Sequence, residues 1–363
     1  IVQEGGSELV DLSPFFKNGK DKWRVLIVQA GEYYSYIDVF ESILNAFQNE
    51  GWIKEVTIPE KEKKSMKTLL SYLKKNKISN FLEFSPELFI DFDWDEKKIR
   101  NNQWIQPFKN QNIDLVIALG TLAGQAAALL KDWHIPVLVD SVSEPVESEI
   151  CVSYEDSGKD FLTVRTDPKS FLRQMYLFYD VVGFKKLGII YTDSVVGKGY
   201  AALSDVEAVA QEKGFQIIKN TNVLEDPPDE KIPLAEEQYL KALEDLCPHI
   251  DAIYLTIQAG LTEDNIGKIM KIINRYQIPS FAMEGQIFVK KGVLFGVSDN
   301  ELVSTGIYNL RKIVQIFKGK SPRSLQQIFE HAPHIAINLK TAEHIGYDIP
   351  IDIIDSSDEI YTK

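Results

Sequence analysis

Few residues of this chain have the types and spacing that catalysis requires. Among the five histidines, His331 and His334 lie close enough, in the stretch His-Ala-Pro-His, to offer two metal ligands. Pro333 disfavours a helix between them, and no third ligand is evident nearby. The sequence has no Gly-x-Ser-x-Gly nucleophile motif, phosphate-binding loop or glycine-rich dinucleotide motif. We therefore expect no metal, no cofactor and no enzymatic activity.

Polar and aromatic side chains instead follow the predicted strands, where ligands bind in α/β proteins. Glu32 and Tyr33 come after an apolar stretch, and a carboxylate beside tyrosine rings could orient an amphipathic ligand. A surface turn capped by Ser35 explains the same residues equally well. Gly120 and Thr121 open a helix of small residues, where free backbone amides attract an anion such as a carboxylate. Plain capping and close helix packing are the alternative there.

The other predicted strand ends also carry hydroxyl, amide or carboxylate groups. Short polar groups on rigid strand ends can fix a small molecule without any reactive nucleophile. Each aspartate among them could instead be an ordinary helix cap. These strand ends are residues 141–145, 166–167, 192–194, 256–258, 284–285 and 298–299.

The elements that position these residues form two series of alternating strands and helices. Apolar, β-branched stretches predict strands covered on both faces, and apolar residues at three- and four-residue steps predict helices. The first series has expected strands at 24–30, 114–120 and 135–140 and helices at 36–50 and 122–133. The second has strands at 162–165, 186–192, 215–219, 251–256 and 278–283, with helices at 169–182, 201–213, 234–246 and 263–276.

Two such series predict two α/β lobes, each a doubly wound parallel sheet with helices on both faces. The length of 363 residues agrees with two lobes of about 150 residues each. Residues 142–157 form an irregular polar connector in this interpretation. The formal charge of −13 repels phosphate backbones, so we expect no nucleic-acid binding. No apolar stretch is long enough to span a bilayer.

The two cysteines are too few for a disulfide framework, and we expect Cys151 and Cys247 to be free, buried thiols. The chain begins with Ile1 and shows no signal segment, which indicates that its start was processed or trimmed. Removal of an export signal would fit that start.

Several segments, in order, resemble the ABC-transporter substrate-binding proteins of the tryptophan/tyrosine-binding type, which have the type I periplasmic-binding fold. The resemblance covers about Trp23 to the end, and its specificity lies in the ordered set of segments. The matching stretches are 117–127, 135–137, 143–146, 186–191, 251–254, 278–282 and 336–350.

The resemblance implies two discontinuous lobes joined by three crossovers, with a ligand enclosed in the cleft between them. One lobe would combine residues 22–141 with 284–324, and the other would combine 158–283 with 326–363. The binding loops of the family correspond to Glu32, Tyr33, Thr121, Ser143, Asp167, Thr256, Glu284 and Asp299, to which the helix start at Gly120 is added.

The chain departs from the family pattern at three places. The usual Asn-x-Thr-Gly stretch before the second lobe is replaced at 160–165, and the usual Asp-Pro of the first hinge loop is Glu144-Pro145. The Pro-x-Asp after the Asp-Ala-Ile-Tyr stretch is replaced by Thr256-Ile257-Gln258. This last site faces the ligand in relatives, so the replacement bears on ligand identity more than on fold.

The expected function is therefore that of an extracytoplasmic solute-binding protein of an ABC importer. It would close by a hinge on a small polar ligand, an aromatic or another amino acid, and deliver it to the ABC permease subunits. We expect a monomer, periplasmic or at the cell surface, whose one possible link to the membrane is a lipid anchor removed with the start of the chain. The alternative is a ligand-sensing module of a signalling receptor with the same fold.

Overall fold

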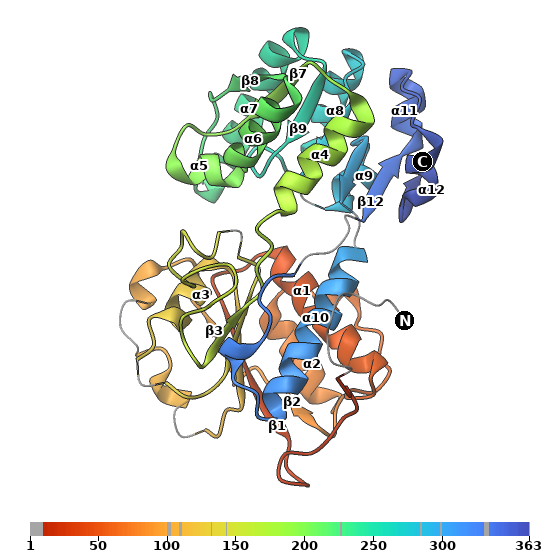
Figure 1. Cartoon of the computed structure of the whole chain (residues 1–363). Helices are drawn as coiled ribbons and strands as arrows, with labels where there is room; N and C mark the ends of the chain where they lie inside the picture. Colours follow the sequence, from red (N-terminus) through yellow and green to blue (C-terminus); the bar gives the residue numbers. More distant parts are fainter. Residues whose placement is uncertain are drawn as a thin grey trace. The chain divides into compact units, whose positions relative to one another are not determined.

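The computed structural model describes residues 10–99, 103–108, 111–131, 133–142, 144–225, 227–283, 285–297, 300–329 and 334–362. The chain divides into two compact units. Unit 1 comprises Ile1–Pro168 and Leu302–Glu330, and unit 2 comprises Lys169–Glu301 and His331–Lys363. The chain therefore passes from one unit to the other three times, as the expected fold requires (Figure 1).

The boundaries differ from the expected ones at all three passages. Residues 142–157, whose described part is irregular, and residues 158–168 belong to unit 1. Residues 285–297 belong to unit 2, and residues 326–329 belong to unit 1. The second boundary lies near the start of a long helix, which carries the chain into unit 1 from Leu302 onward.

Unit 1 contains a parallel sheet in which β1 pairs with three other strands. The order is β2-β1-β4-β5-β6, and β3 pairs with the carboxyl half of β1 while β2 pairs with its amino half. The strands are β1 (Trp23–Gln29), β2 (Leu82–Glu83), β3 (Phe89–Asp91), β4 (Leu115–Leu119), β5 (Val137–Asp140) and β6 (Leu162–Val164).

Both faces of this sheet are covered, which explains why its strands are mostly apolar. Val25 and Ile27 pack in the core under one set of helices, whereas Leu26 and Val28 pack with α3 and the loops before β4. The helices on the first face are α1 (Tyr34–Asn49), α2 (Met66–Lys75) and α10 (Asn300–Phe317), and α3 spans Thr121–Ala128. Short 3-10 turns lie at Glu60–Glu62, Glu96–Lys98, Gln106–Phe108 and Pro322–Ser324.

Unit 2 contains a second sheet, of order β13-β12-β11-β10-β9-β7-β8. Its strands are parallel, as expected, except that β12 runs antiparallel to β11. The strands are β7 (Lys186–Ile190), β8 (Gln216–Asn220), β9 (Ala252–Leu255), β10 (Ser280–Ala282), β11 (Phe295–Val297), β12 (Ile335–Asn338) and β13 (Glu359–Tyr361).

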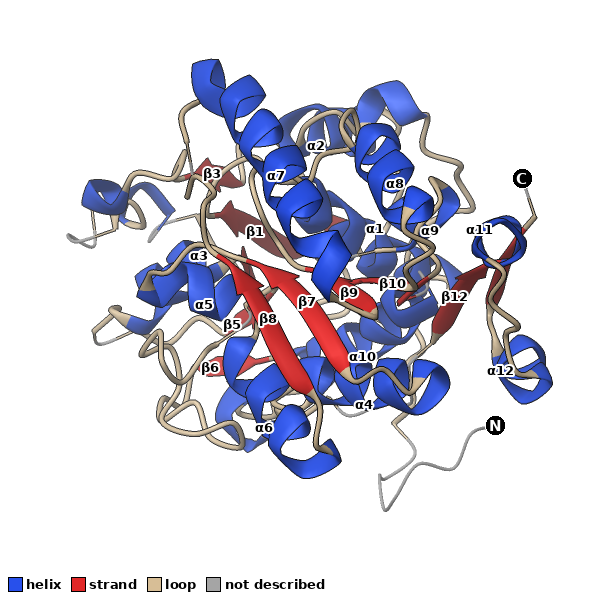
Figure 2. Ribbon diagram, turned by 90° about the horizontal axis from the view of Figure 1, so that it is seen from above, coloured by secondary structure: helices blue, strands red, loops and turns tan. Residues whose placement is uncertain are grey.

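Helices cover both faces of this sheet as well. Figure 2 shows α7 on one side of β7 and β8 and α6 on the other. Apolar side chains of α4 and α6 pack on one face, and those of α7 and α8 pack on the opposite face. The helices are α4 (Ser170–Val182), α5 (Val195–Tyr200), α6 (Leu203–Lys213), α7 (Ile232–Leu246), α8 (Ile266–Arg275), α9 (Gln286–Lys290), α11 (Leu339–Ile345) and α12 (Ile351–Ser356), with 3-10 turns at Asp229–Lys231 and Cys247–His249.

Two sequence-based expectations are corrected. Strand β6 does not begin the second series, because it pairs in parallel with β5 and completes the sheet of unit 1. The helix expected over 122–133 already ends at Ala128. The prediction of free, buried cysteines is confirmed for Cys151 and Cys247. Within the described residues, no helix is both long and apolar enough to cross a membrane.

Candidate ligand-binding site

The carboxyl ends of β1, β4 and β5 lie at one level in unit 1. The backbone N–H of Ala30 donates to the carbonyl oxygen of Leu119 (3.0 Å), and the N–H of Gly120 donates to that of Asp140 (3.0 Å). Ligands of open α/β sheets bind at such an edge. The predicted residues that the structure brings to it are Glu32 and Tyr33, after β1, and Gly120 and Thr121, after β4.

Gly120, at the end of β4, lies very close to the side chain of Tyr36. Its φ of +89° is unfavourable for a residue with a side chain. A Cβ there would lie 2.0 Å from the hydroxyl oxygen of Tyr36. Helix α3 begins at the next residue, Thr121, and no side chain caps it. The first backbone N–H groups of a helix have no partner within the helix, so this end of α3 can accept an anion.

Aromatic rings surround the end of β1. The ring centroid of Tyr33 lies 4.7 Å from that of Tyr34 and 5.3 Å from that of Tyr36. Tyr36 in turn lies 6.2 Å from Trp94, which follows β3. Sequence reasoning missed Trp94, because β3 is only three residues long and gives no alternating pattern.

A cavity of about 410 Å³ opens in unit 1 beside the start of α1. Its lining contains the predicted residues Glu32 and Tyr33. The full set is Gln29, Glu32, Tyr33, Tyr34, Ile37, Asp38, Glu41, Glu60, Lys63, Lys64, Ser65 and Met66. Four of these side chains are carboxylates and two are lysines, so the lining carries a negative formal charge.

The charges in this cavity are only partly paired. The Nζ of Lys63 lies 2.8 Å from carboxylate oxygens of both Glu41 and Glu60. Burial, with the nearby Glu41 carboxylate, raises the pKa of Asp38 to about 6, although Lys63 opposes this shift. A ligand ammonium group would relieve the cost of an ionised Asp38, because an opposite charge favours the ionised form.

The remaining predicted residues lie elsewhere or outside the described part of the chain. Asp167 is half-buried, just after β6 and at the boundary of unit 1. Thr256 is buried in unit 2, and its hydroxyl donates to the carbonyl oxygen of Ile190 (2.8 Å), which ties the end of β9 to β7. The other three, Ser143, Glu284 and Asp299, lie outside the described residues.

A buried ionic network lies next to this edge of the sheet, at the end of β5. The Asp140 carboxylate is fully buried, and both its oxygens share a bifurcated hydrogen bond from the Nε–H of Arg165, at 3.0 and 2.8 Å. It also accepts one from the side-chain amide of Asn309 on α10 (2.6 Å). The guanidinium of Arg165 keeps the pKa of Asp140 below its usual value despite burial. The network therefore joins β5, the end of β6 and α10.

Lys312 is a second buried cation beside Asp140. Its Nζ donates to the carbonyl oxygen of Val164 (3.0 Å) and lies 4.6 Å from the ring centroid of Tyr308. Burial lowers the pKa of Lys312 to about 7, although the Asp140 carboxylate acts in the opposite direction. Sequence reasoning gave no sign of this lysine, because nothing in the pattern of α10 distinguishes a buried lysine from a solvated one.

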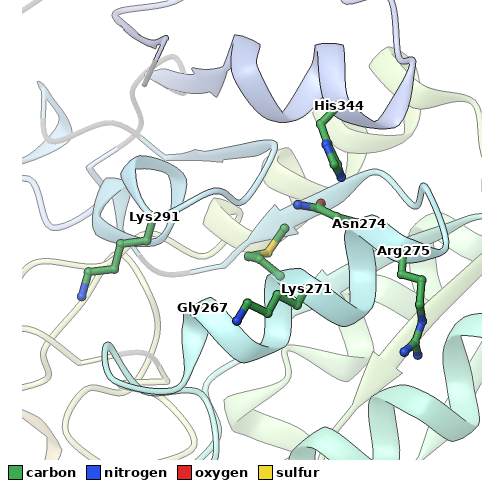
Figure 3. Close-up of a pocket in the computed structure, with 7 residues that line it drawn as sticks. Gly267, Lys271, Asn274, Arg275, Lys291 and His344 are labelled. Carbon is green, nitrogen blue, oxygen red and sulfur yellow. The ribbon is translucent and has the colours of Figure 1, made fainter.

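Unit 2 has a separate cavity of about 410 Å³ along α8 (Figure 3). It is lined by Gly267, Met270, Lys271, Asn274, Arg275, Lys291 and His344. Arg275 forms an ion pair with Glu244, and Lys291 forms one with Glu263. None of the predicted ligand-binding residues lines this cavity.

The described residues contain no group of three or more His, Cys, Asp or Glu side chains that could hold a metal. Burial raises the pKa of Cys151 to about 11 and that of Cys247 to about 12, so both thiols are protonated at neutral pH.

Solved structures with the same fold are substrate-binding and related proteins. The chain is similar to a conserved domain protein from Vibrio cholerae (TM-score 0.64), to a Streptococcus pneumoniae ABC domain in complex with L-Trp (0.63), and to a ligand-free, open substrate-binding protein from Clostridium difficile (0.64). Each is 18% identical, over 94% of this chain and 100% of the other. At this identity the similarity establishes the fold, which is the type I periplasmic-binding fold.

A comparison with curated proteins found no match. The family model of the ABC transporter substrate-binding proteins matches residues 95–360, which is well over half of the chain. This match confirms the resemblance noted in the sequence. Proteins of this kind bind a small molecule for an ABC transporter, act outside the cytoplasm and are not enzymes. The chain belongs to the family of ABC transporter substrate-binding proteins.

Proposed function

We propose that this protein is the solute-binding component of an ABC importer and that its ligand is an amino acid. One observation carries the proposal: a cavity lined by carboxylates and tyrosines opens beside the end of β1, and the uncapped start of α3 follows β4, the strand paired with β1. A free amino acid has a carboxylate, an ammonium group and a side chain, and each has a matching partner here.

The start of α3, at Gly120 and Thr121, would receive the ligand carboxylate on free backbone N–H groups. Glu32, which is exposed, and Asp38, which is half-buried, would attract the ammonium group. Tyr33 would flank the ligand side chain, since an aromatic ring offers a large apolar face. Asp167, Ser143, Thr256, Glu284 and Asp299 are further proposed contacts.

The L-Trp named for the complex from Streptococcus pneumoniae supports an amino-acid ligand. The proposal also includes a role in import, as opposed to sensing. It further includes a monomeric protein that is attached to the membrane by a lipid anchor. In this mechanism the two lobes close on the ligand by a hinge, and closure is favoured only by contacts that the open state lacks.

A thermal-shift screen tests the proposal. The standard L-amino acids, a set of sugars and a set of nucleosides would each be added to the purified protein. A tightly bound ligand raises the melting temperature because it binds only the folded state. At a hundredfold excess over Kd the stabilisation is about 2.7 kcal/mol, a shift of several degrees.

We expect a shift with at least one amino acid and none with the sugars or nucleosides. The reverse pattern would discard the amino-acid assignment. Small-angle X-ray scattering with the same ligand tests closure: an unchanged radius of gyration at saturation contradicts it.

A further inference from the structure

The cavity along α8 in unit 2 has a basic lining. Three of its side chains are cations, Lys271, Arg275 and Lys291, and no described aspartate or glutamate lines it. His344, from α11, adds an imidazole. The chain as a whole has 53 acidic and 40 basic residues, so the charge of this lining is opposite in sign to that of the whole protein. A cavity of this charge attracts anions.

Helix α8 supplies most of this charge. The helix, Ile266–Arg275, contains three basic residues and no acidic one. Lys271 and Arg275 are four residues apart, so their side chains lie on the same face, where like charges slightly destabilise a helix. The opposite face is apolar, and Ile269 and Ile273 pack there in the core of unit 2. An anion bound from solution would relieve the repulsion between the two cations.

The protein itself engages the cations of this cavity only weakly. Within the described residues, Lys271 forms no ion pair and no side-chain hydrogen bond. Arg275 pairs with Glu244, and the Nζ of Lys291 lies 2.7 Å from a carboxylate oxygen of Glu263. All four side chains of these two pairs are at least about one third exposed. Exposed ion pairs contribute little stability, so an incoming anion can compete for both cations.

Asn274 and Gly267 shape the same cavity. The side-chain oxygen of Asn274 is buried and has no hydrogen-bond partner within the described residues. It can therefore accept a hydrogen bond from a ligand hydroxyl. A Cβ at Gly267 would meet no heavy atom within 4 Å, so close packing does not require glycine in this helix, where glycine is unfavourable. The missing side chain at this position keeps the cavity open.

The cations are spread along the cavity rather than gathered at one point. Figure 3 shows Lys291 and Arg275 on opposite sides of Lys271. Glu263, the partner of Lys291, precedes α8, whereas Arg275 is the last residue of the helix. Cations separated in this way match a ligand whose negative charges lie on separate groups. The volume of about 410 Å³ suits a small organic molecule better than a single inorganic ion.

We propose that this cavity is a second binding site of the protein, for a small organic anion that carries two or more carboxylates and a hydroxyl group. The carboxylates would contact Lys271, Arg275 and Lys291, and the hydroxyl would donate to the side-chain oxygen of Asn274. None of the residues proposed to bind the amino acid lines this cavity. The second site therefore adds to the proposed function and does not depend on it.

Isothermal titration calorimetry with citrate, which has three carboxylates and one hydroxyl, tests the proposal. Tricarballylate is the matched ligand without the hydroxyl, and inorganic phosphate is a compact anion that can reach fewer of the cations. The buffer would contain about 0.1 M NaCl, which screens charges more than about 10 Å apart. We expect one citrate to bind per protein, and tricarballylate and phosphate each to bind at least about tenfold more weakly.

Two variants and a matched control locate the binding. Lys271→Gln removes the unpaired cation, whereas Gly267→Leu fills the cavity and favours the helix, so that folding is not at risk. Each should weaken citrate binding by at least about tenfold. Lys268→Gln removes the same charge from the same helix, but Lys268 does not line the cavity. This control should weaken binding by less than about threefold.

Three results would overturn the proposed site: no saturable binding of citrate to wild type, equal losses of affinity in Lys271→Gln and Lys268→Gln, or undiminished affinity in Gly267→Leu. Tricarballylate or phosphate bound as tightly as citrate would overturn the ligand class. None of these results bears on the amino-acid function, which concerns other residues and other ligands.

Discussion

At the scale of single residues, Gly120 sets how closely Tyr36 approaches the start of α3. Replacing it with alanine would strain a φ of +89° and place a Cβ 2.0 Å from the Tyr36 hydroxyl oxygen. We expect Gly120→Ala to destabilise the protein by about 4 kcal/mol, of which about 2 kcal/mol is backbone strain, because its φ of +89° with a ψ of 162° is open essentially only to glycine.

Gly183→Ala is the control for this substitution. Gly183 caps α4 at a φ of +67°, but no heavy atom lies within 4 Å of its hypothetical Cβ, so only strain should appear, about 1 kcal/mol. Urea unfolding of both variants gives the comparison. Equal losses of stability would show that the contact with Tyr36 carries no cost.

At the residue level, the position of a residue relative to a strand was predictable, whereas its role in binding stays a prediction. Glu32, Tyr33, Gly120 and Thr121 follow strands that the apolar pattern locates well, and the structure brings all four to one edge. Trp94 could not be predicted in the same way, since its placement depends on positive φ angles that no sequence pattern reveals.

At the scale of elements, the buried network ties β5, the end of β6 and α10 together through Asp140, Arg165 and Lys312. The low pKa of Lys312 makes a prediction about pH. Below about pH 7 the lysine is charged in both the folded and the unfolded protein, so the folded protein bears the full cost of burying the charge. Between pH 7 and pH 10 only the unfolded state keeps the proton, and the free energy of unfolding therefore rises with pH.

Lys312→Met removes this contribution and leaves those of other groups unchanged. The quantity to compare is the free energy of unfolding of the variant minus that of wild type. We expect this difference to be about 2 kcal/mol more positive at pH 6.5 than at pH 9. The lost hydrogen bond to Val164 shifts both values equally and so cancels. Urea unfolding at the two pH values measures this change. A difference that is the same at both would mean that Lys312 keeps its proton throughout, held by Asp140.

Prediction of elements was best for long, regular segments. Helix α4 was expected over 169–182 and spans Ser170–Val182, and strand β7 also lies within its expected range. Strand β6 was assigned to the wrong series, because only pairing with β5 reveals its sheet. Helix α10 was not predicted, although Leu310, Ile313, Val314 and Phe317 have helical spacing and pack in the core of unit 1.

At the scale of the whole molecule, the fold followed from repetition of strand and helix together with the family resemblance. Periodicity alone gave two lobes in sequence order, whereas the resemblance added three passages of the chain from one to the other. The boundaries were less accurate, since the passages near Pro168, Glu301 and Glu330 share no compositional signal. Ligand identity depends on a few side chains and is the part that sequence pattern specifies least.

The central claim is that unit 1 recognises the carboxylate and ammonium groups common to amino acids. Calorimetric titration with L-tryptophan, with tryptamine, which lacks the carboxylate, and with indole-3-propionate, which lacks the ammonium group, tests it most directly. We predict saturable one-site binding of L-tryptophan and at least about tenfold weaker binding of each analogue, as expected for loss of one charge-assisted contact. Equal affinity for all three compounds, or no saturable binding of L-tryptophan, would contradict this account.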